Sequence, residues 1–151
     1  MLKKQISTTP SDKKGMLGDQ IAEIRGKVTG QRVLDAAEGP KVEYSFTASG
    51  TMKGVEITHM ATFYTIPKGN ALYGQGQGVI TTRDGSGEMA TETGQGIGKF
   101  TDDGKKVMFR GSFFYKASSS GKLAFLNNIV GVFEYEGDEL GNTFYKVWEW
   151  K

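Results

Sequence analysis

The stretch Gly74-Gln75-Gly76-Gln77-Gly78 is followed after a short interval by Gly94-Gln95-Gly96-Ile97-Gly98, and these two segments decide the fold class. Each places glycine at every second residue, and the sequence between them, Thr82-Arg83-Asp84-Gly85-Ser86-Gly87-Glu88, is typical of a turn. The pattern predicts a β-hairpin with all six glycines on one face, because successive strand residues point to opposite faces. Glycine inside a strand is costly and usually marks a close approach, a bend or a barrel corner.

The turn residues predict a register for this hairpin. A three-residue loop at Gly85-Ser86-Gly87 pairs Asp84 with Glu88. The same register pairs the glycines of the two segments as Gly78 with Gly94, Gly76 with Gly96, and Gly74 with Gly98.

The next hairpin is predicted by Asp103-Gly104, a strong two-residue turn signal. Its register pairs the glycine segment with an aromatic strand: Phe109 with Gly98, Gly111 with Gly96, Phe113 with Gly94, Val107 with Phe100, and Tyr115 with Glu92. Aromatic rings over cross-strand glycines stabilise curved sheets. Both hairpins therefore predict one face that combines glycines and aromatic rings.

The rest of the chain also has a period of two from residue 19 onward. We expect strands over 21–28, 41–48, 51–66, 129–136 and 143–151, turns at Thr29-Gly30 and Ser49-Gly50, a return strand over 31–37, and a short helical turn over 122–128. The sequence thus predicts an all-β fold: a single antiparallel, hairpin-connected β-barrel of about eight to ten strands. We expect it to span residues 18–151 after a flexible segment of residues 1–17.

Composition excludes several classes of function. The 151 residues carry a net charge of +2, which argues against a nucleic-acid partner. The chain has no cysteine and a single histidine, so disulfides, thiolate ligands and a histidine-rich metal site are excluded within one chain. The Gly98-Lys99 pair is followed by Phe100, which a phosphate-binding loop would not have. We expect no cofactor.

The same composition bears on location. The first fifteen residues are polar and no long apolar run follows, so we expect no membrane association and a cytoplasmic protein.

Three polar residues are candidates for catalysis: Glu92, Tyr115 and His59. Glu92 lies on the glycine–aromatic face, and an acid inside a barrel can act as a general acid or base. His59 shares a strand face with Ile57 and Ala61. The alternative is structural: Glu92 bonds to Tyr115 or reaches water, and His59 is a satisfied core residue.

A barrel lumen is also a candidate ligand site, for which we expect lining by Phe109, Phe113, Ile80, Gly94 and Gly96. The glycine stripe can leave the lumen open, or the phenylalanine rings can fill it. On the opposite face, Arg110 is expected to be solvated, and Met108 and Phe114 to meet a terminus or a partner subunit. Trp148 and Trp150 fit either an interface or a plug of the barrel.

The pattern of short hairpin-linked strands with Gly-x-Gly segments, chiefly over residues 40–136, resembles the small barrels of the allene oxide cyclase and dirigent type and related bacterial domains of unknown function. The resemblance implies an apolar lumen with a few polar groups, a small hydrophobic ligand, and a homo-oligomer, either a dimer or a trimer. The hypotheses are therefore a binding protein for a small apolar or amphipathic molecule, a cofactor-independent isomerase or cyclase acting in the same lumen, and a filled barrel that works through oligomer or partner contacts.

Overall fold

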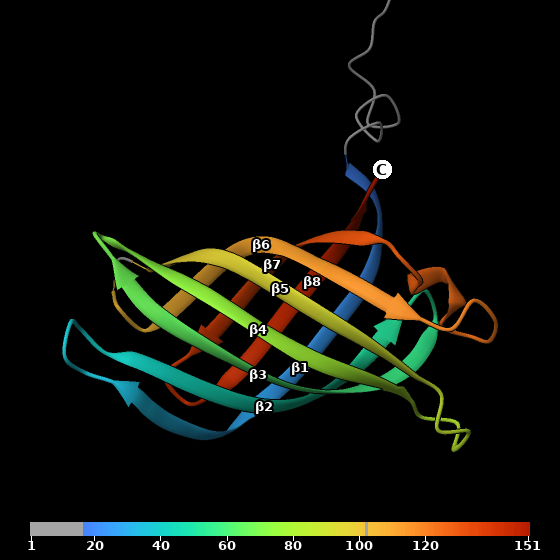
Figure 1. Cartoon of the computed structure of the whole chain (residues 1–151), viewed down its shortest axis with the longest axis horizontal. Coiled ribbons are helices and arrows are strands. Elements are labelled where there is room, and N and C mark those ends of the chain that lie inside the picture. The colour runs from blue at the N-terminus through green and yellow to red at the C-terminus, as the bar shows by residue number, and fades with distance from the viewer. Residues whose placement is uncertain (1–16, 102) are drawn as a thin grey trace, which may run out of the picture.

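The computed structural model describes residues 17–101 and 103–151, in which eight antiparallel strands close into one barrel (Figure 1). The strands are β1 (Leu17–Asp35), β2 (Lys41–Met52), β3 (Val55–Lys68), β4 (Ala71–Thr82), β5 (Met89–Phe100), β6 (Lys106–Ala117), β7 (Val130–Asp138) and β8 (Asn142–Trp150). Each strand pairs with its neighbour in sequence, and β1 pairs with β8 to close the barrel. The predicted fold class is confirmed. Of the segment expected to be flexible, residues 1–16 lie outside the described residues, and Leu17 begins β1.

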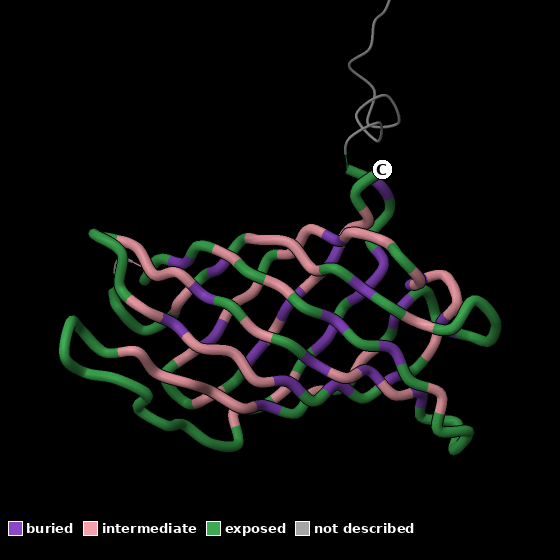
Figure 2. Tube along the Cα trace, viewed as in Figure 1, coloured by how far each residue is buried: buried purple, intermediate pink, exposed green. Residues whose placement is uncertain are grey.

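Buried and exposed residues alternate along most of the strands, as Figure 2 shows by colour. On β5, for example, Ala90 and Glu92 are buried while Thr91 and Thr93 are exposed. The glycine–aromatic face is the face that points into the barrel. The interior is therefore set by the period of two in the sequence.

The register predicted for β5 and β6 is confirmed: Gly98 pairs with Phe109, and Gly94 with Phe113. The register predicted for β4 and β5 is wrong by two residues, because Gly78 pairs with Glu92 instead of Gly94. The cause lies in the turn, where Asp84 does not pair with Glu88. Its Oδ1 instead accepts hydrogen bonds from Thr82 Oγ1 and Ser86 N, each at 2.9 Å. A shift of two residues leaves every side chain on its original face.

Two expected turns are also wrong. β1 runs unbroken through Thr29-Gly30, where a register shift between Val28 and Gly30 accommodates the extra residue as a bulge. The turn expected at Ser49-Gly50 lies at Lys53-Gly54, whose φ angles of 46° and 79° suit a two-residue type I′ loop. Gly50 instead permits a close strand contact, since a Cβ there would lie 2.9 Å from the Ile24 Cα.

One end of the barrel is closed by the segment between β6 and β7. It contains the short 3₁₀-helix η1 (Ala124–Leu126), where a helical turn was expected. Leu123 and Leu126 are fully buried, and they join an aliphatic core of Ile21, Ile24, Met52, Ile57, Ile80 and Val147. The Glu88 carboxylate accepts hydrogen bonds from the backbone N–H groups of Lys122 and Leu123, at 3.1 and 2.7 Å. This carboxylate therefore holds the segment between β6 and β7 (residues 118–129, here called the plug) against the β4–β5 turn.

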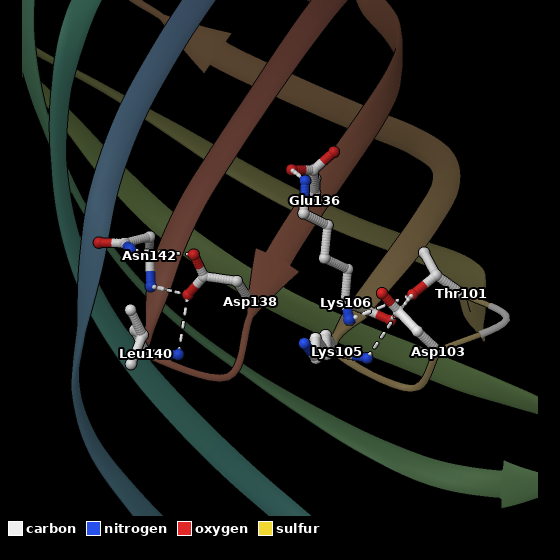
Figure 3. A network of polar contacts seen from close by, with 8 residues as sticks. All are labelled: Thr101, Asp103, Lys105, Lys106, Glu136, Asp138, Leu140 and Asn142. Carbon is white, nitrogen blue, oxygen red and sulfur yellow. Dashed lines mark hydrogen bonds and ion pairs between the residues drawn. The ribbon is translucent and has the colours of Figure 1, made fainter.

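The opposite end of the barrel carries the turns drawn in Figure 3. Asp138 Oδ1 accepts hydrogen bonds from the N–H groups of Leu140 and Asn142, each at 2.9 Å, and Lys106 Nζ lies 3.0 Å from Glu136 Oε2. Hydrogen bonds from Asn142 hold the pKa of Asp138 below its usual value. These contacts fix the turns. Three interior aromatic residues, Tyr44, Phe63 and Tyr135, are only partly buried.

Candidate functional site

A buried carboxylate and a buried imidazole meet in the middle of the barrel. Glu92 lies on β5 and His59 on β3, and their side chains approach each other across β4, with 3.1 Å between Oε1 and Nε2. The residues are 5% and 2% exposed. Gly78 on β4 makes the contact possible, since a Cβ at that position would overlap the imidazole. The Nε2 atom makes no hydrogen bond of good geometry within the described residues, so its contact with Glu92 is mainly electrostatic.

Tyr145 on β8 completes this polar group from the other side of the imidazole. Its hydroxyl is hydrogen-bonded to His59 Nδ1. Burial raises the pKa of Tyr145 well above its ordinary value, and the nearby charge of Glu92 raises it further. Tyr145 therefore keeps its phenol proton, and its hydroxyl contacts one nitrogen of the imidazole while Glu92 approaches the other. Sequence reasoning missed Tyr145, although the alternation of β8 places it inside with Thr143 and Val147.

Tyr115, the third candidate for catalysis, lies directly beside Glu92 on the neighbouring strand β6. Its hydroxyl is buried and has no hydrogen-bond partner in the described part of the chain. Burial raises the pKa of Tyr115 well above its ordinary value, with a further contribution from the Glu92 charge. The structure thus brings Glu92, His59 and Tyr115 into one region and adds Tyr145 to them.

Aromatic rings fill most of the lumen. The glycines of β4 and β5 provide room for them: a Cβ at Gly98 would lie 2.6 Å from the Phe109 ring, and one at Gly96 would lie 3.1 Å from the Phe133 ring. Phe113 and Phe133 stack with their centroids 4.3 Å apart. Of the two alternatives for the glycine stripe, the filled one applies to most of its length.

A cavity of about 70 Å³ remains between these rings. It is about half the size of an engineered cavity of roughly 150 Å³ that holds benzene. Four of the residues expected to line it do so: Phe109, Phe113, Gly94 and Gly96. Glu92, a candidate for catalysis, also forms part of its wall. Ile80 does not line it, and is fully buried in the aliphatic core. Sequence reasoning did not include five further aromatic residues of the lining: Phe46, Phe63, Phe133, Tyr135 and Tyr145. The sequence signal that could have identified them is their position on the inward face of each strand, which follows from the alternation of side chains.

The outer face agrees with the sequence pattern. Met108 and Phe114 are 42% and 50% exposed, and Arg110 points outward to Glu134, with 3.4 Å between its Nε and Oε2. Trp148 and Trp150 alternate with the inward residues of β8, so they do not plug the barrel.

In the described residues, no cluster of three or more histidine and acidic side chains could hold a metal ion. No helix in that part of the chain has the length and apolar character needed for a membrane span.

These features define a closed antiparallel β-barrel with an aromatic lumen and a buried carboxylate–imidazole–phenol group. No family model matches the sequence, and no curated protein matches it. The structure is similar to the crystal structure of a protein of unknown function from Clostridium acetobutylicum, with a TM-score of 0.68 and 12% sequence identity over 87% of this chain and 96% of that chain. This likeness shows the barrel fold, and the fold alone.

Proposed function

We propose that the barrel binds a small, largely apolar molecule in its lumen, with one polar group of the ligand against Glu92. The cavity supports this proposal, because aromatic rings surround it and a buried carboxylate forms part of its wall. An apolar pocket with a few well-placed polar groups is the usual form of a small-molecule site.

The size of the cavity limits the ligand. Pockets that hold drug-sized molecules have volumes of roughly 300–1,000 Å³, far more than the space present. A ligand that fits without rearrangement therefore has only a few non-hydrogen atoms. A larger one requires the partly buried rings of Phe63 and Tyr135 to turn toward solvent. A lumen ligand is also what the resemblance to allene oxide cyclase and dirigent barrels implies.

Native mass spectrometry of the freshly purified protein, with a denaturing run alongside, tests this proposal. We expect excess mass that disappears on denaturation and gives the mass of the ligand. Ala61→Leu, which adds bulk at a residue lining the cavity, should abolish the excess. Met60→Leu is the matched control, because Met60 is 64% exposed on the outer face of the same strand. Excess mass that survives Ala61→Leu would place the ligand elsewhere.

A second candidate function is a cofactor-independent isomerase, which the chain Tyr145–His59–Glu92 favours. Tyr145 and Glu92 both line the cavity, and the imidazole between them contacts each one. Two groups that can exchange protons with a ligand at separate atoms are what a proton-transfer isomerase needs. The test is to incubate the ligand recovered from the protein in D₂O and measure deuterium at its carbon atoms. We expect Glu92→Gln to retain binding and stop incorporation, whereas unchanged incorporation would exclude Glu92 from the chemistry.

Oligomer formation is the third proposal, and the exposed apolar side chains of Met108 and Phe114 support it. The same native spectrum reports the mass of the assembly. We expect a dimer or a trimer that Phe114→Lys dissociates, and a monomer at all concentrations would contradict it.

A further inference from the structure

The first strand is longer than the strand that closes the barrel beside it. β1 spans 19 residues, whereas β8 spans nine and pairs with β1 only as far as Lys27, opposite Asn142. One backbone hydrogen bond follows, from the Val28 N–H to the Gly141 carbonyl at 2.8 Å. Over residues 29–35, β1 has β2 on one side and no strand of the described residues on the other. This stretch is therefore a free strand edge.

The hairpin formed by this part of β1 and by β2 extends past the turn between β7 and β8, at the lower left of Figure 1. Every residue from Thr29 to Pro40 is exposed. The edge presents backbone N–H and C=O groups without a strand partner in the part of the chain described, and such an edge is a template for another strand. A two-stranded hairpin by itself is at most marginally stable in water, so a strand added beside β1 would stabilise it.

Exposed apolar side chains gather at this edge. The two most exposed large apolar side chains of the described chain are Leu140, at 72%, and Val33, at 65%. Leu140 precedes Gly141, the acceptor of the Val28 N–H, so it lies where the free edge begins. Val33 lies on the edge itself and is followed by Leu34, which is also exposed. A group of exposed apolar side chains marks an interaction site.

The charges near the edge are balanced within the hairpin. Arg32 Nη2 lies 3.2 Å from Glu43 Oε1 on β2, and Asp35 is paired with Lys41 in the strand register. Many proteins keep other strands away from an exposed edge with unbalanced charged side chains. Here the balance leaves no net charge to oppose the approach of an identical edge.

We infer that a second copy of this chain pairs with β1 along this edge, antiparallel and related by a two-fold axis, so that the sheets of two barrels join. The contact with β8 ends at Val28, and the register with β2 shifts after Val33, so the available stretch is residues 29–33 with Gln31 at its centre.

The side chains of this stretch are compatible with an axis at Gln31. The axis places Gln31 opposite Gln31 of the second copy, Gly30 opposite Arg32, and Thr29 opposite Val33. No like charges are then directly opposite each other, whereas an axis at Arg32 would oppose two arginines, which is destabilising. This interface is separate from the lumen and from Met108 and Phe114, because β7 and β8 lie between β6 and β1.

A pair of charge variants tests the interface and its register. Gln31→Lys and Gln31→Glu each place two like charges opposite each other, and we expect each to weaken the dimer at least about tenfold in sedimentation velocity. An equimolar mixture of the two variants should restore a dimer, and native mass spectrometry should show one copy of each. Thr51→Lys is the control, since Thr51 is exposed on β2 with β1 and β3 on its two sides, and it should leave the dissociation constant unchanged.

Amide hydrogen exchange of the unmodified protein provides a second measurement that does not depend on any variant. We compare concentrations below and above the dissociation constant. The N–H groups of residues 29–33 that face the free edge should exchange at least about tenfold more slowly in the dimer. Amides of β4, which has a strand on each side, should exchange at the same rate at both concentrations.

The outcomes separate this interface from the functions proposed above. A dimer that Phe114→Lys dissociates and Gln31→Lys does not would uphold the outer-face oligomer and overturn the edge pairing. A monomer at all concentrations would overturn both and leave the lumen proposal standing. Slow exchange over residues 29–33 in a monomer would show that another part of the same chain covers the edge, and it would overturn the inference as well.

Discussion

The imidazole of His59 occupies the space that a methyl group on Gly78 would need, and through this gap it reaches Glu92. The glycine lies on the strand between the two polar residues, and it pairs directly with Glu92. A residue with no side chain thus permits a contact between side chains two strands apart.

Gly78→Ala should therefore destabilise the barrel by about 1–3 kcal/mol, because the added methyl group overpacks the site and displaces His59. Urea unfolding measures the change. Gly30→Ala is the matched control: no atom of the described residues lies within 4 Å of a Cβ there, and the φ of Gly30 is not in the left-handed region. We expect that control to be neutral or to stabilise by about 0.5 kcal/mol. Equal effects of the two substitutions would contradict the steric explanation.

Gly98 and Phe109 form a second pair of this kind, and their coupling can be measured directly. A Cβ at Gly98 would lie 2.6 Å from the Phe109 ring, so Gly98→Ala alone should cost about 1–3 kcal/mol. In a Phe109→Ala background the methyl group meets no ring, and the same substitution should cost much less. A double-mutant cycle of unfolding free energies gives the interaction. Simple additivity would mean that the ring does not require the glycine.

The two buried tyrosines near Glu92 should respond in opposite ways to loss of the hydroxyl. Tyr115→Phe removes a buried hydroxyl without a partner, so we expect a neutral effect or a gain of about 1 kcal/mol. Tyr145→Phe removes the hydrogen bond to His59 Nδ1 and should cost about 1–3 kcal/mol. Both residues are 2% exposed, so each is the control of the other. A larger loss for Tyr115→Phe would show that its hydroxyl has a partner.

We also predict that the protein loses stability at alkaline pH, because three of its tyrosines are buried. Burial raises the pKa of Tyr115, Tyr135 and Tyr145 above the ordinary value of 10.0. Above that pH the unfolded chain loses phenol protons that the folded chain keeps. The contribution of these three phenols to the free energy of unfolding is thus fully present below pH 10, and it is lost as the pH rises toward the folded-state pKa values. Each tyrosine contributes a slope of about 1.4 kcal/mol per pH unit.

Urea unfolding in a series of alkaline buffers measures this slope. For three tyrosines we expect about 4 kcal/mol per pH unit, and Tyr115→Phe should remove about one third of it. A stability that does not change with pH above 10 would contradict the burial of these phenols.

Glu88 should stabilise the segment that closes one end of the barrel. Glu88→Gln weakens the charge-assisted hydrogen bonds to the N–H groups of Lys122 and Leu123, with an expected loss of about 1–3 kcal/mol. Amide exchange at Leu126 should accelerate, since its N–H is bonded within the plug. Glu139→Gln in the exposed β7–β8 turn is the control. Unchanged exchange at Leu126 would show that the plug holds without Glu88.

Face assignments could be predicted from sequence more securely than turns. The Asp103-Gly104 signal predicted the β5–β6 register correctly, because turn chemistry and the glycine–aromatic pattern indicate the same pairing. The β4–β5 register differed by two residues, since hydrogen bonds of Asp84 within the turn lengthened the loop. At Thr29-Gly30 the chain forms a bulge in a long strand, where pairing with β2 outweighs the local turn preference.

By itself, the sequence determined the all-β class, the shared face of the glycines and aromatic rings, and the strand faces on which Glu92, His59 and Tyr115 lie. Each follows from the alternation of side chains along one strand, which is a local property. Tertiary structure alone decided that Tyr145 meets His59, and that rings fill the glycine stripe except for a small cavity. These contacts join side chains across the lumen from strands distant in sequence, and barrel closure sets their distances.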